Sequence, residues 1–161
     1  MKLSFGMIFS IILIIIFLAI AFIAIQTLLS FKDQAMIGKF FDALDSDVIK
    51  ASNSQAFSGV PKTYFLPTSI EYLCFMDFTK NKNEVQATNG FYDDFKFISS
   101  EDNVFLYPTD AGGDLGSKNI PKLDIDKTTF QSNPFCIKNI DGKINLNLNK
   151  ESGQNLVTIK K

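Results

Sequence analysis

Two cysteines are the side chains in this sequence best suited to covalent chemistry. Cys74 and Cys136 lie far apart in the chain, and each falls in a stretch with the alternating pattern of a β-strand. An even number of cysteines in a domain outside the cytoplasm favours a disulfide. Closing so long a loop would stabilise the fold by about 4 kcal/mol in the chain-entropy model. We therefore predict a disulfide, the alternative being two buried free thiols that pack as small hydrophobic groups.

The other polar side chains form no recognisable reaction centre. All 16 basic residues are lysine, and the lack of Arg and His removes both the guanidinium fork and the usual general base near pH 7. Two cysteines without a histidine make a poor metal site, and a thiol nucleophile would have no base. The glycine-rich run Gly112–Lys118 has neither the spacing nor the residue order of a phosphate loop. We therefore expect no catalytic activity, no metal and no cofactor.

Composition limits the architecture and the partners. A chain of 161 residues with 46% hydrophobic residues can form one modest domain in addition to its N-terminal segment. The lysines are dispersed and balanced by acidic residues, which gives a net charge of −1. This pattern argues against nucleic-acid binding.

The hydrophobic residues are concentrated near the N-terminus. Residues 5–25 carry no charge, and residues 11–25 include no polar side chain. As a helix, the uncharged run would be roughly 30 Å long, which matches the hydrocarbon core of a bilayer. We predict a short tail over 1–4 and a transmembrane helix over 5–29. A cleavable signal peptide is the alternative, because Ala19-Ile20-Ala21 fits a small-x-small cleavage site.

The orientation of this helix is inferred from the domain that follows it. Lysines on both sides leave the positive-inside rule undecided. The N-terminal tail is too short to be a domain, and both cysteines come after the apolar segment. We therefore expect a single-pass protein of the cell membrane whose C-terminal domain lies outside the cytoplasm.

Residues 30–57 change to an amphipathic helical pattern. Apolar residues recur at steps of three and four, while acidic residues and lysines fall largely elsewhere around the helix. The stripe consists of Ile37, Phe40, Phe41, Leu44 and Val48, followed by Ala51. No residue interrupts the helix between the two patterns, so we predict one continuous helix of about 45 to 50 residues. The stripe is expected to cover its own domain, with a partner helix in an oligomer as the alternative.

From Pro61 onward the periodicity becomes two, and we predict an extracytoplasmic β-rich domain over 58–161. The run Ser69–Asp77 is apolar on both faces, as in a central strand. Shorter strands are predicted at Thr63–Pro67, Phe95–Ile98 and Val104–Tyr107, with long loops at Thr79–Gly90 and Pro108–Pro121. The pair Asp141-Gly142 between alternating runs predicts a type I′ hairpin, and a further strand over Asn155–Lys160 would complete a three-stranded meander. The fold class is thus α+β, a long N-terminal helix followed by a small antiparallel sheet.

The ensemble of these segments resembles an uncharacterised type of archaeal single-pass membrane protein with a small disulfide-containing β domain. The resemblance rests on the apolar helix, on Ile70–Asp77, on Asn103–Pro108, on Phe135–Ile137 with the second cysteine, and on the hairpin Asp141–Ile144. It implies a membrane protein but no known activity.

The architecture also resembles that of type IV pilins and pilin-like subunits. These have a long N-terminal helix, half in the membrane and half amphipathic, followed by a small antiparallel sheet. Lys2 and Gly6 loosely match the leader of a prepilin, whereas Ile11 stands where bacterial pilins commonly have Glu. The resemblance implies a structural or assembly subunit at the cell surface.

The expected partners are therefore membrane lipid, further copies of the chain or other surface proteins. The alternative is a membrane-tethered binding or adhesion module that uses the loops Thr79–Gly90 and Pro108–Pro121. An enzyme is the least favoured class.

Overall fold

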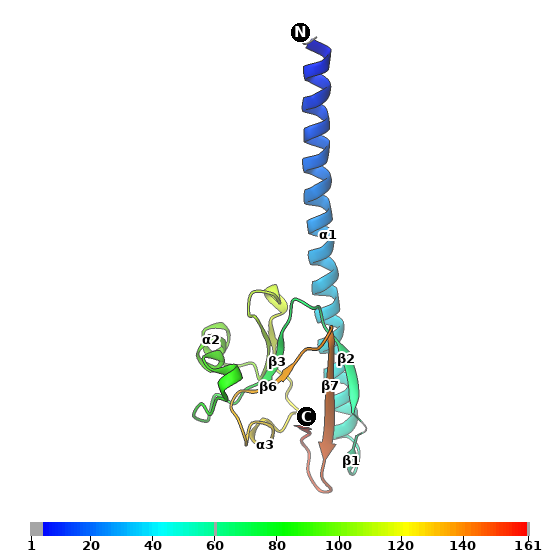
Figure 1. Ribbon diagram of the computed structural model, residues 1–161. Helices are drawn as coiled ribbons and strands as arrows, with labels where there is room; N and C mark the ends of the chain where they lie inside the picture. Colours follow the sequence, from blue (N-terminus) through cyan, green and yellow to red (C-terminus); the bar gives the residue numbers. More distant parts are fainter. Residues whose placement is uncertain (1–4, 60, 161) are drawn as a thin grey trace. The chain divides into compact units, whose positions relative to one another are not determined.

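The computed structural model describes residues 5–59 and 61–160 (Figure 1). The chain divides into two compact units, Met1–Asp33 and Gln34–Lys161. Helix α1 (Phe5–Ser52) contributes to both units and is one continuous helix of 48 residues, as predicted. The predicted tail over 1–4 lies outside the described residues. The fold class is α+β, as the sequence predicts.

In the second unit, α1 presents its apolar stripe to the sheets. The stripe residues are buried because a spacing of three and four residues places them on one face of the helix. The helix ends at Ser52, before the boundary predicted at residue 57. The Asn53 N–H still donates to the carbonyl oxygen of Ile49 at 3.1 Å, and the chain then turns toward the first strand.

The first antiparallel sheet is built around the long strand β7 (Lys143–Lys150). Strands β1 (Phe57–Ser58) and β2 (Lys62–Phe65) pair with successive parts of β7, and β8 (Thr158–Lys160) also pairs with it. Along β7, Ile144, Leu146 and Leu148 are buried, while the asparagines between them face the other side of the sheet. This strand therefore shows the period of two that its sequence predicts.

The second antiparallel sheet has the strand order β5-β4-β3-β6. Its strands are β3 (Tyr72–Phe75), β4 (Val104–Tyr107), β5 (Ser117–Lys118) and β6 (Phe135–Lys138). β3 pairs with β4 on one side and β6 on the other, so it is the predicted central strand, although it is shorter than Ser69–Asp77. The predicted loop over 108–121 contains β5 and the short helix η2 (Gly113–Leu115).

The strand predicted at Phe95–Ile98 is wrong, because these residues belong to helix α2 (Phe91–Ile98). Gly90 precedes the helix at a φ of 93°, a conformation that other residues rarely adopt. The Glu84 carboxylate then accepts the main-chain N–H of Tyr92 at 2.8 Å and satisfies one of the free donors of the first turn. Phe91 and Phe95 are buried four residues apart, which is helical spacing. Asp93 and Asp94 occupy the first turn of this helix.

The predicted meander is present only in its last two strands, β7 and β8. Asp141 and Gly142 have positive φ values of 53° and 76°, as a type I′ turn requires. Ile140 and Lys143 form the bridge that closes this turn, but β6 pairs with β3 and not with β7. The Asn139 side chain, which is buried, donates to the carbonyl oxygens of Pro67 and Ile70 at 2.9 and 2.7 Å and ties this end of β6 to the chain leading into β3.

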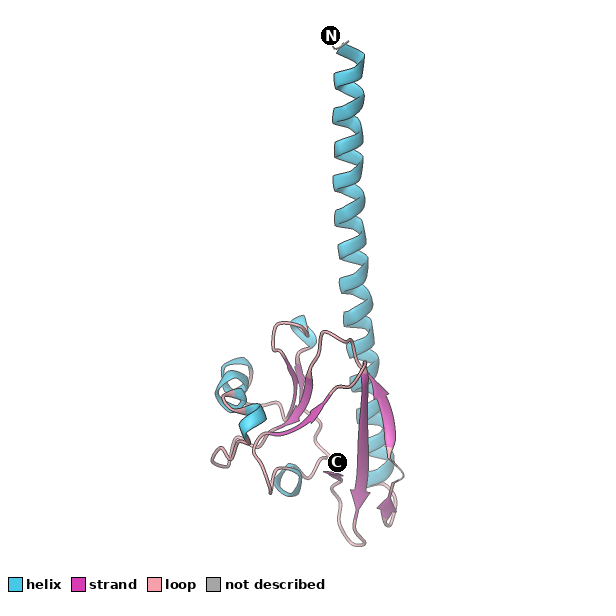
Figure 2. Cartoon of the chain, viewed as in Figure 1, coloured by secondary structure: helices cyan, strands magenta, loops and turns pink. Residues whose placement is uncertain are grey.

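Helix α3 (Ile125–Thr128) and the short helix η1 (Gln86–Thr88) complete the second unit (Figure 2). The hydrophobic residues of this unit form two clusters. The larger is mainly aliphatic and contains the α1 stripe together with side chains of both sheets. The smaller is mainly aromatic and lies on the other face of the β5-β4-β3-β6 sheet, where α2 covers it.

Candidate functional site

Cys74 and Cys136 form a disulfide between β3 and β6. The two residues stand directly opposite each other in the register of the strands, and their Cα atoms are 4.1 Å apart. Cys74 is fully buried and belongs to the aromatic cluster, with Cys136 packed against it. The bond therefore fixes a pairing between strands that are distant in sequence and is covered by α2, which makes its role structural.

Aromatic rings surround this disulfide. Phe91 of α2 stacks on Tyr107 of β4 with ring centroids 3.7 Å apart, and Phe95 stacks on Phe105 at 4.8 Å. Offset and edge-to-face contacts of this kind add about 0.5 to 1.5 kcal/mol per pair beyond the burial of area. The cluster thus holds α2 on the sheet without any charged side chain in its interior.

The α1 stripe lies inside the aliphatic cluster. All five predicted stripe residues are buried there, and Ile37, Leu44 and Val48 have no exposed area. The Phe40 ring meets the Phe41 ring at 5.2 Å and the edge of Tyr64 in β2 at 5.8 Å. These residues are therefore already packed by their own domain.

A polar cluster of three residues joins the helix to β2 beside the stripe. The Asp47 carboxylate accepts the Lys62 ammonium at 2.5 Å and the Tyr64 hydroxyl at 2.7 Å. Burial raises the pKa of the Asp47 carboxyl, but these two hydrogen bonds and the lysine charges outweigh burial and bring the pKa below its usual 3.8. Burial and the hydrogen bond to Asp47 raise the pKa of the Tyr64 hydroxyl above its usual 10.0. All three groups lie in the second unit, outside the apolar segment.

Lys150 fastens the C-terminal end of α1 to β7. The residue is buried, and its ammonium donates to the carbonyl oxygens of Ser52, at 2.5 Å, and Ser54. The last carbonyls of a helix have no partner within the helix, and a cation there also interacts favourably with the helix dipole. The sequence analysis did not single out Lys150. The only sequence feature that could have indicated its role is its position in β7, where the alternation places Lys150 on the same side as the buried Ile144, Leu146 and Leu148.

The apolar segment of α1 is exposed along its whole described length. Residues 6–32 are all exposed, and they include a long run of large hydrophobic side chains. The hydroxyls of Ser10 and Thr27 each donate to the carbonyl oxygen four residues earlier, at 2.9 Å. Such bonds satisfy these two hydroxyls within the helix, as an apolar surrounding requires. By length and composition, this is a helix that can cross a membrane.

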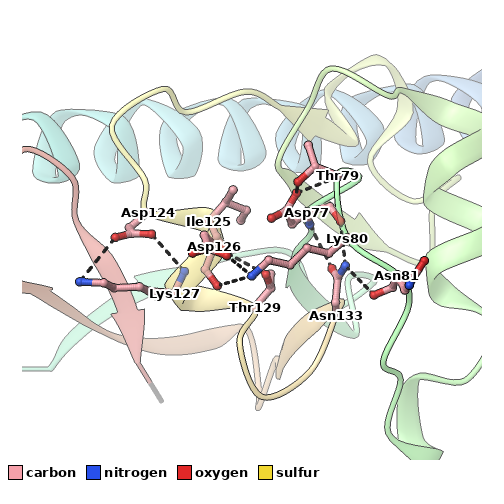
Figure 3. Close-up of polar contacts among 10 residues, drawn as sticks. All are labelled: Asp77, Thr79, Lys80, Asn81, Asp124, Ile125, Asp126, Lys127, Thr129 and Asn133. Atoms are coloured by element: carbon pink, nitrogen blue, oxygen red, sulfur yellow. Dashed lines mark hydrogen bonds and ion pairs between the residues drawn. The ribbon is translucent and has the colours of Figure 1, made fainter.

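The loop predicted at Thr79–Gly90 is tied at its beginning to the segment around α3 (Figure 3). Asn133 accepts the Asp77 N–H at 3.0 Å and donates to the Asp77 carbonyl oxygen at 2.7 Å. The Asp77 carboxylate in turn accepts the N–H and hydroxyl of Thr79 at 2.9 and 2.6 Å. Lys80 forms an ion pair with Asp126. These groups satisfy one another, so this network fixes two loops together.

The loop predicted at Pro108–Pro121 borders a cavity of about 460 Å³ that contains three carboxylates, Asp102, Asp110 and Asp114. The Ser117 hydroxyl donates to Asp102 at 2.6 Å. Within residues 5–59 and 61–160, no group of three or more acidic, cysteine or histidine side chains is arranged to hold a metal ion.

Comparisons with models of protein families, with curated proteins and with solved structures found no match to this chain. The resemblances to archaeal membrane proteins and to pilins therefore stay predictions from the sequence.

Proposed function

We propose that this chain is a membrane-anchored structural or assembly subunit of pilin-like architecture, whose disulfide-bonded domain lies outside the cytoplasm. The observation that carries the proposal is the contrast within α1. Its first part exposes an uncharged row of large hydrophobic side chains, whereas the stripe of its second part is buried in its own domain. An exposed apolar surface of this size requires lipid or neighbouring helices to cover it.

The disulfide supports the location of the domain. Disulfides form and persist in oxidising compartments, outside the reducing cytosol. The Cys74–Cys136 bond is buried under α2, and the described residues contain no free cysteine. A domain that follows a membrane segment and carries such a bond fits the outer side of the membrane.

Small side chains support helix association as well as anchoring. Ala19, Ala21 and Ala24 interrupt the large residues of the apolar segment. Small residues let helix backbones approach closely in a membrane, where packing and not the hydrophobic effect drives association. A subunit that assembles through this segment needs no apolar surface from the second unit.

The second candidate is a membrane-tethered binding or adhesion module. It is favoured by two aromatic side chains that the domain does not bury, Phe97 at 90% and Phe130 at 79% exposure. Exposed aromatic groups of this kind are common at protein interfaces.

Photo-crosslinking in native membranes tests the proposal. A photoreactive residue is placed at Phe17 in the apolar segment, and, as the matched control, at Phe97 in the domain. A subunit that assembles through its helix gives a ladder of crosslinked copies from Phe17. Crosslinks from Phe97 alone would favour the binding module. If neither position gave crosslinked products, the chain would be an isolated membrane-anchored protein, which contradicts the proposed assembly.

Protease added to intact cells tests the location. An external domain is digested while the apolar segment stays in the membrane. A domain that is degraded only after the cells are opened would contradict the proposed orientation.

A further inference from the structure

The hairpin between the two sheets opens after a single residue pair. Ile140 and Lys143 exchange two main-chain hydrogen bonds of 3.0 Å across the Asp141-Gly142 turn. A regular antiparallel hairpin would next pair Lys138 with Asn145. Among the strand pairs and bridges of the described residues, none joins Lys138 to Asn145, because β6 pairs with β3 in one sheet and β7 pairs with β2 in the other.

The main-chain groups of Lys138 face away from β3. In an antiparallel ladder, alternate residues direct both N–H and C=O to the same neighbour. The Asn139 N–H donates to the Glu71 carbonyl oxygen at 2.8 Å, so Ile137, two residues earlier, also bonds toward β3. Lys138, between them, therefore directs its N–H and C=O to the open edge of β6. The Cα separation of 4.1 Å at Cys136 is short, as expected for a pair that does not exchange main-chain hydrogen bonds.

The main-chain groups of Asn145 face away from β2 by the same reasoning. The Leu66 N–H donates to the Gly142 carbonyl oxygen at 3.0 Å, and Ile144 stands two residues later in the same ladder. Asn145 is out of phase with both, so its N–H and C=O point to the other edge of β7. On that edge, Lys143 is bonded to Ile140, and β8 begins to pair only at Asn147.

A crevice of about 440 Å³ lies between these two edges. It is lined by Ile137, Lys138, Ile140, Asp141, Lys143 and Asn145. Ile140, which precedes the Asp141-Gly142 turn, leaves 65% of its surface exposed. The crevice therefore has an unpaired strand edge on each of two sides and apolar side chains in its lining. It also has an excess of positive charge, because the lining contains the ammonium groups of Lys138 and Lys143 and the single carboxylate of Asp141.

We infer that this crevice receives an extended acidic peptide segment of another protein, which adds as a strand between β6 and β7. Lys138 on the edge of β6 and Asn145 on the edge of β7 each direct a main-chain donor and acceptor toward an added strand. β-Augmentation uses main-chain groups of this kind at an exposed sheet edge. Lys138, Ile140 and Lys143 are exposed on one face of this hairpin, whereas Ile137 faces the aliphatic cluster. In an added strand with alternating side chains, carboxylates on the first face would meet Lys138 and Lys143, and apolar side chains on the second face would lie beside Ile137. The inference goes beyond the anchoring role and does not depend on the apolar segment of α1.

Peptide binding to the full chain in detergent micelles tests this inference. The probe is the labelled peptide Thr-Val-Glu-Val-Glu-Val-Thr, followed by fluorescence anisotropy. Saturable binding is expected. A peptide with Lys in place of both Glu residues should bind about tenfold more weakly, because it replaces two modest ion pairs with repulsions. An N-methylated copy with identical side chains should not bind, because it lacks the main-chain donors.

Charge reversal in the protein provides the matched variant. Lys138→Glu with Lys143→Glu changes two exposed side chains and should reverse the preference, so that the Lys peptide binds more tightly than the Glu peptide. Lys96→Glu, on the exposed face of α2, should leave the preference unchanged. Hydrogen exchange should show the amides of Lys138 and Asn145 slowed by the Glu peptide and that of Ile144 unaffected.

Several results would overturn the inference. These are equal binding of all three peptides, no binding at millimolar peptide, or an unchanged preference in the double variant. A dimer of the chain that the Glu peptide dissociates would assign the crevice to a second copy and overturn it as well.

Discussion

The two faces of the β5-β4-β3-β6 sheet are covered in different ways. One face contributes Leu73, Val104 and Leu106 to the aliphatic cluster, where α1 and the other sheet meet it. The opposite face contributes Cys74 and Phe105 to the aromatic cluster, which a single short helix and one disulfide close.

The comparison shows two solutions to the same packing problem in a small domain. The aliphatic side gains stability from area, because a long helix and a second sheet bury many side chains at once. The aromatic side is covered by the eight residues of α2 together with Phe78, and uses large rings and a covalent bond instead. Four predictions test this contrast, in order of decreasing expected effect.

The largest effect is expected on the aliphatic side. Phe41→Ala removes a buried ring of the α1 stripe and should lower the free energy of unfolding by about 3 to 5 kcal/mol, as a truncated core aromatic does. Unfolding of the full chain in detergent by denaturant measures it. Phe97→Ala, in an exposed position of α2, is the control and should stay within about 0.5 kcal/mol. Equal stability of both variants, with lost crosslinks for Phe41→Ala, would mean that the stripe packs on neighbouring chains.

The disulfide should contribute almost as much on the aromatic side. Replacing both Cys74 and Cys136 with Ala should lower the free energy of unfolding by about 4 kcal/mol in the chain-entropy model. Alkylation of the denatured, unreduced protein should label neither thiol, whereas labelling after reduction should reach both. Two labelled thiols without reduction would remove the disulfide and the argument for the outer location that depends on it.

A smaller effect is expected at the end of α1. Lys150→Met keeps most of the buried chain but leaves the carbonyl oxygens of Ser52 and Ser54 without their donor. A loss of about 1 to 3 kcal/mol is expected, because two half-buried acceptors lose hydrogen bonds to a charged donor. Lys122→Met, in an exposed position, should change little. Hydrogen exchange at the last turn of α1 should show whether the loss is local, and an unchanged rate there would contradict the role of Lys150.

The smallest effect is pH-dependent and concerns Asp47 and Tyr64. The pKa of Asp47 lies below its usual 3.8, so its contribution to stability is complete above that pH and is lost as the pH falls further. Asp47→Asn should therefore destabilise the fold by about 1 kcal/mol near pH 7, and the difference from wild type should shrink below about pH 4.

For Tyr64 the sign is opposite. Its pKa is raised above 10.0, so its contribution is complete below that pH and is lost above it, where the unfolded chain ionises first. Tyr64→Phe should remove this part of the alkaline decline. The measurement is the free energy of unfolding as a function of pH. Parallel profiles for wild type and both variants would contradict the contribution of the Asp47–Tyr64 hydrogen bond to stability.

Local sequence determined much of this protein. The apolar run sets the exposed part of α1, and the steps of three and four set the buried stripe. The alternating runs set β3, β4 and β7, and Asp141-Gly142 sets the I′ turn. Each of these follows from interactions within a few residues or from the period of one element.

Only the tertiary structure decided which elements meet. A period of two says which side chains share a face but not which strand is the neighbour, so β6 pairs with β3 although the turn places β7 next to it in sequence. Phe95–Ile98 is helical because the sheet beneath it offers an aromatic surface that a helical face covers. Asn133 and Lys150 find their partners only across loops and sheets. The open crevice at Lys138 and Asn145 likewise exists because the two arms of one hairpin, β6 and β7, belong to different sheets.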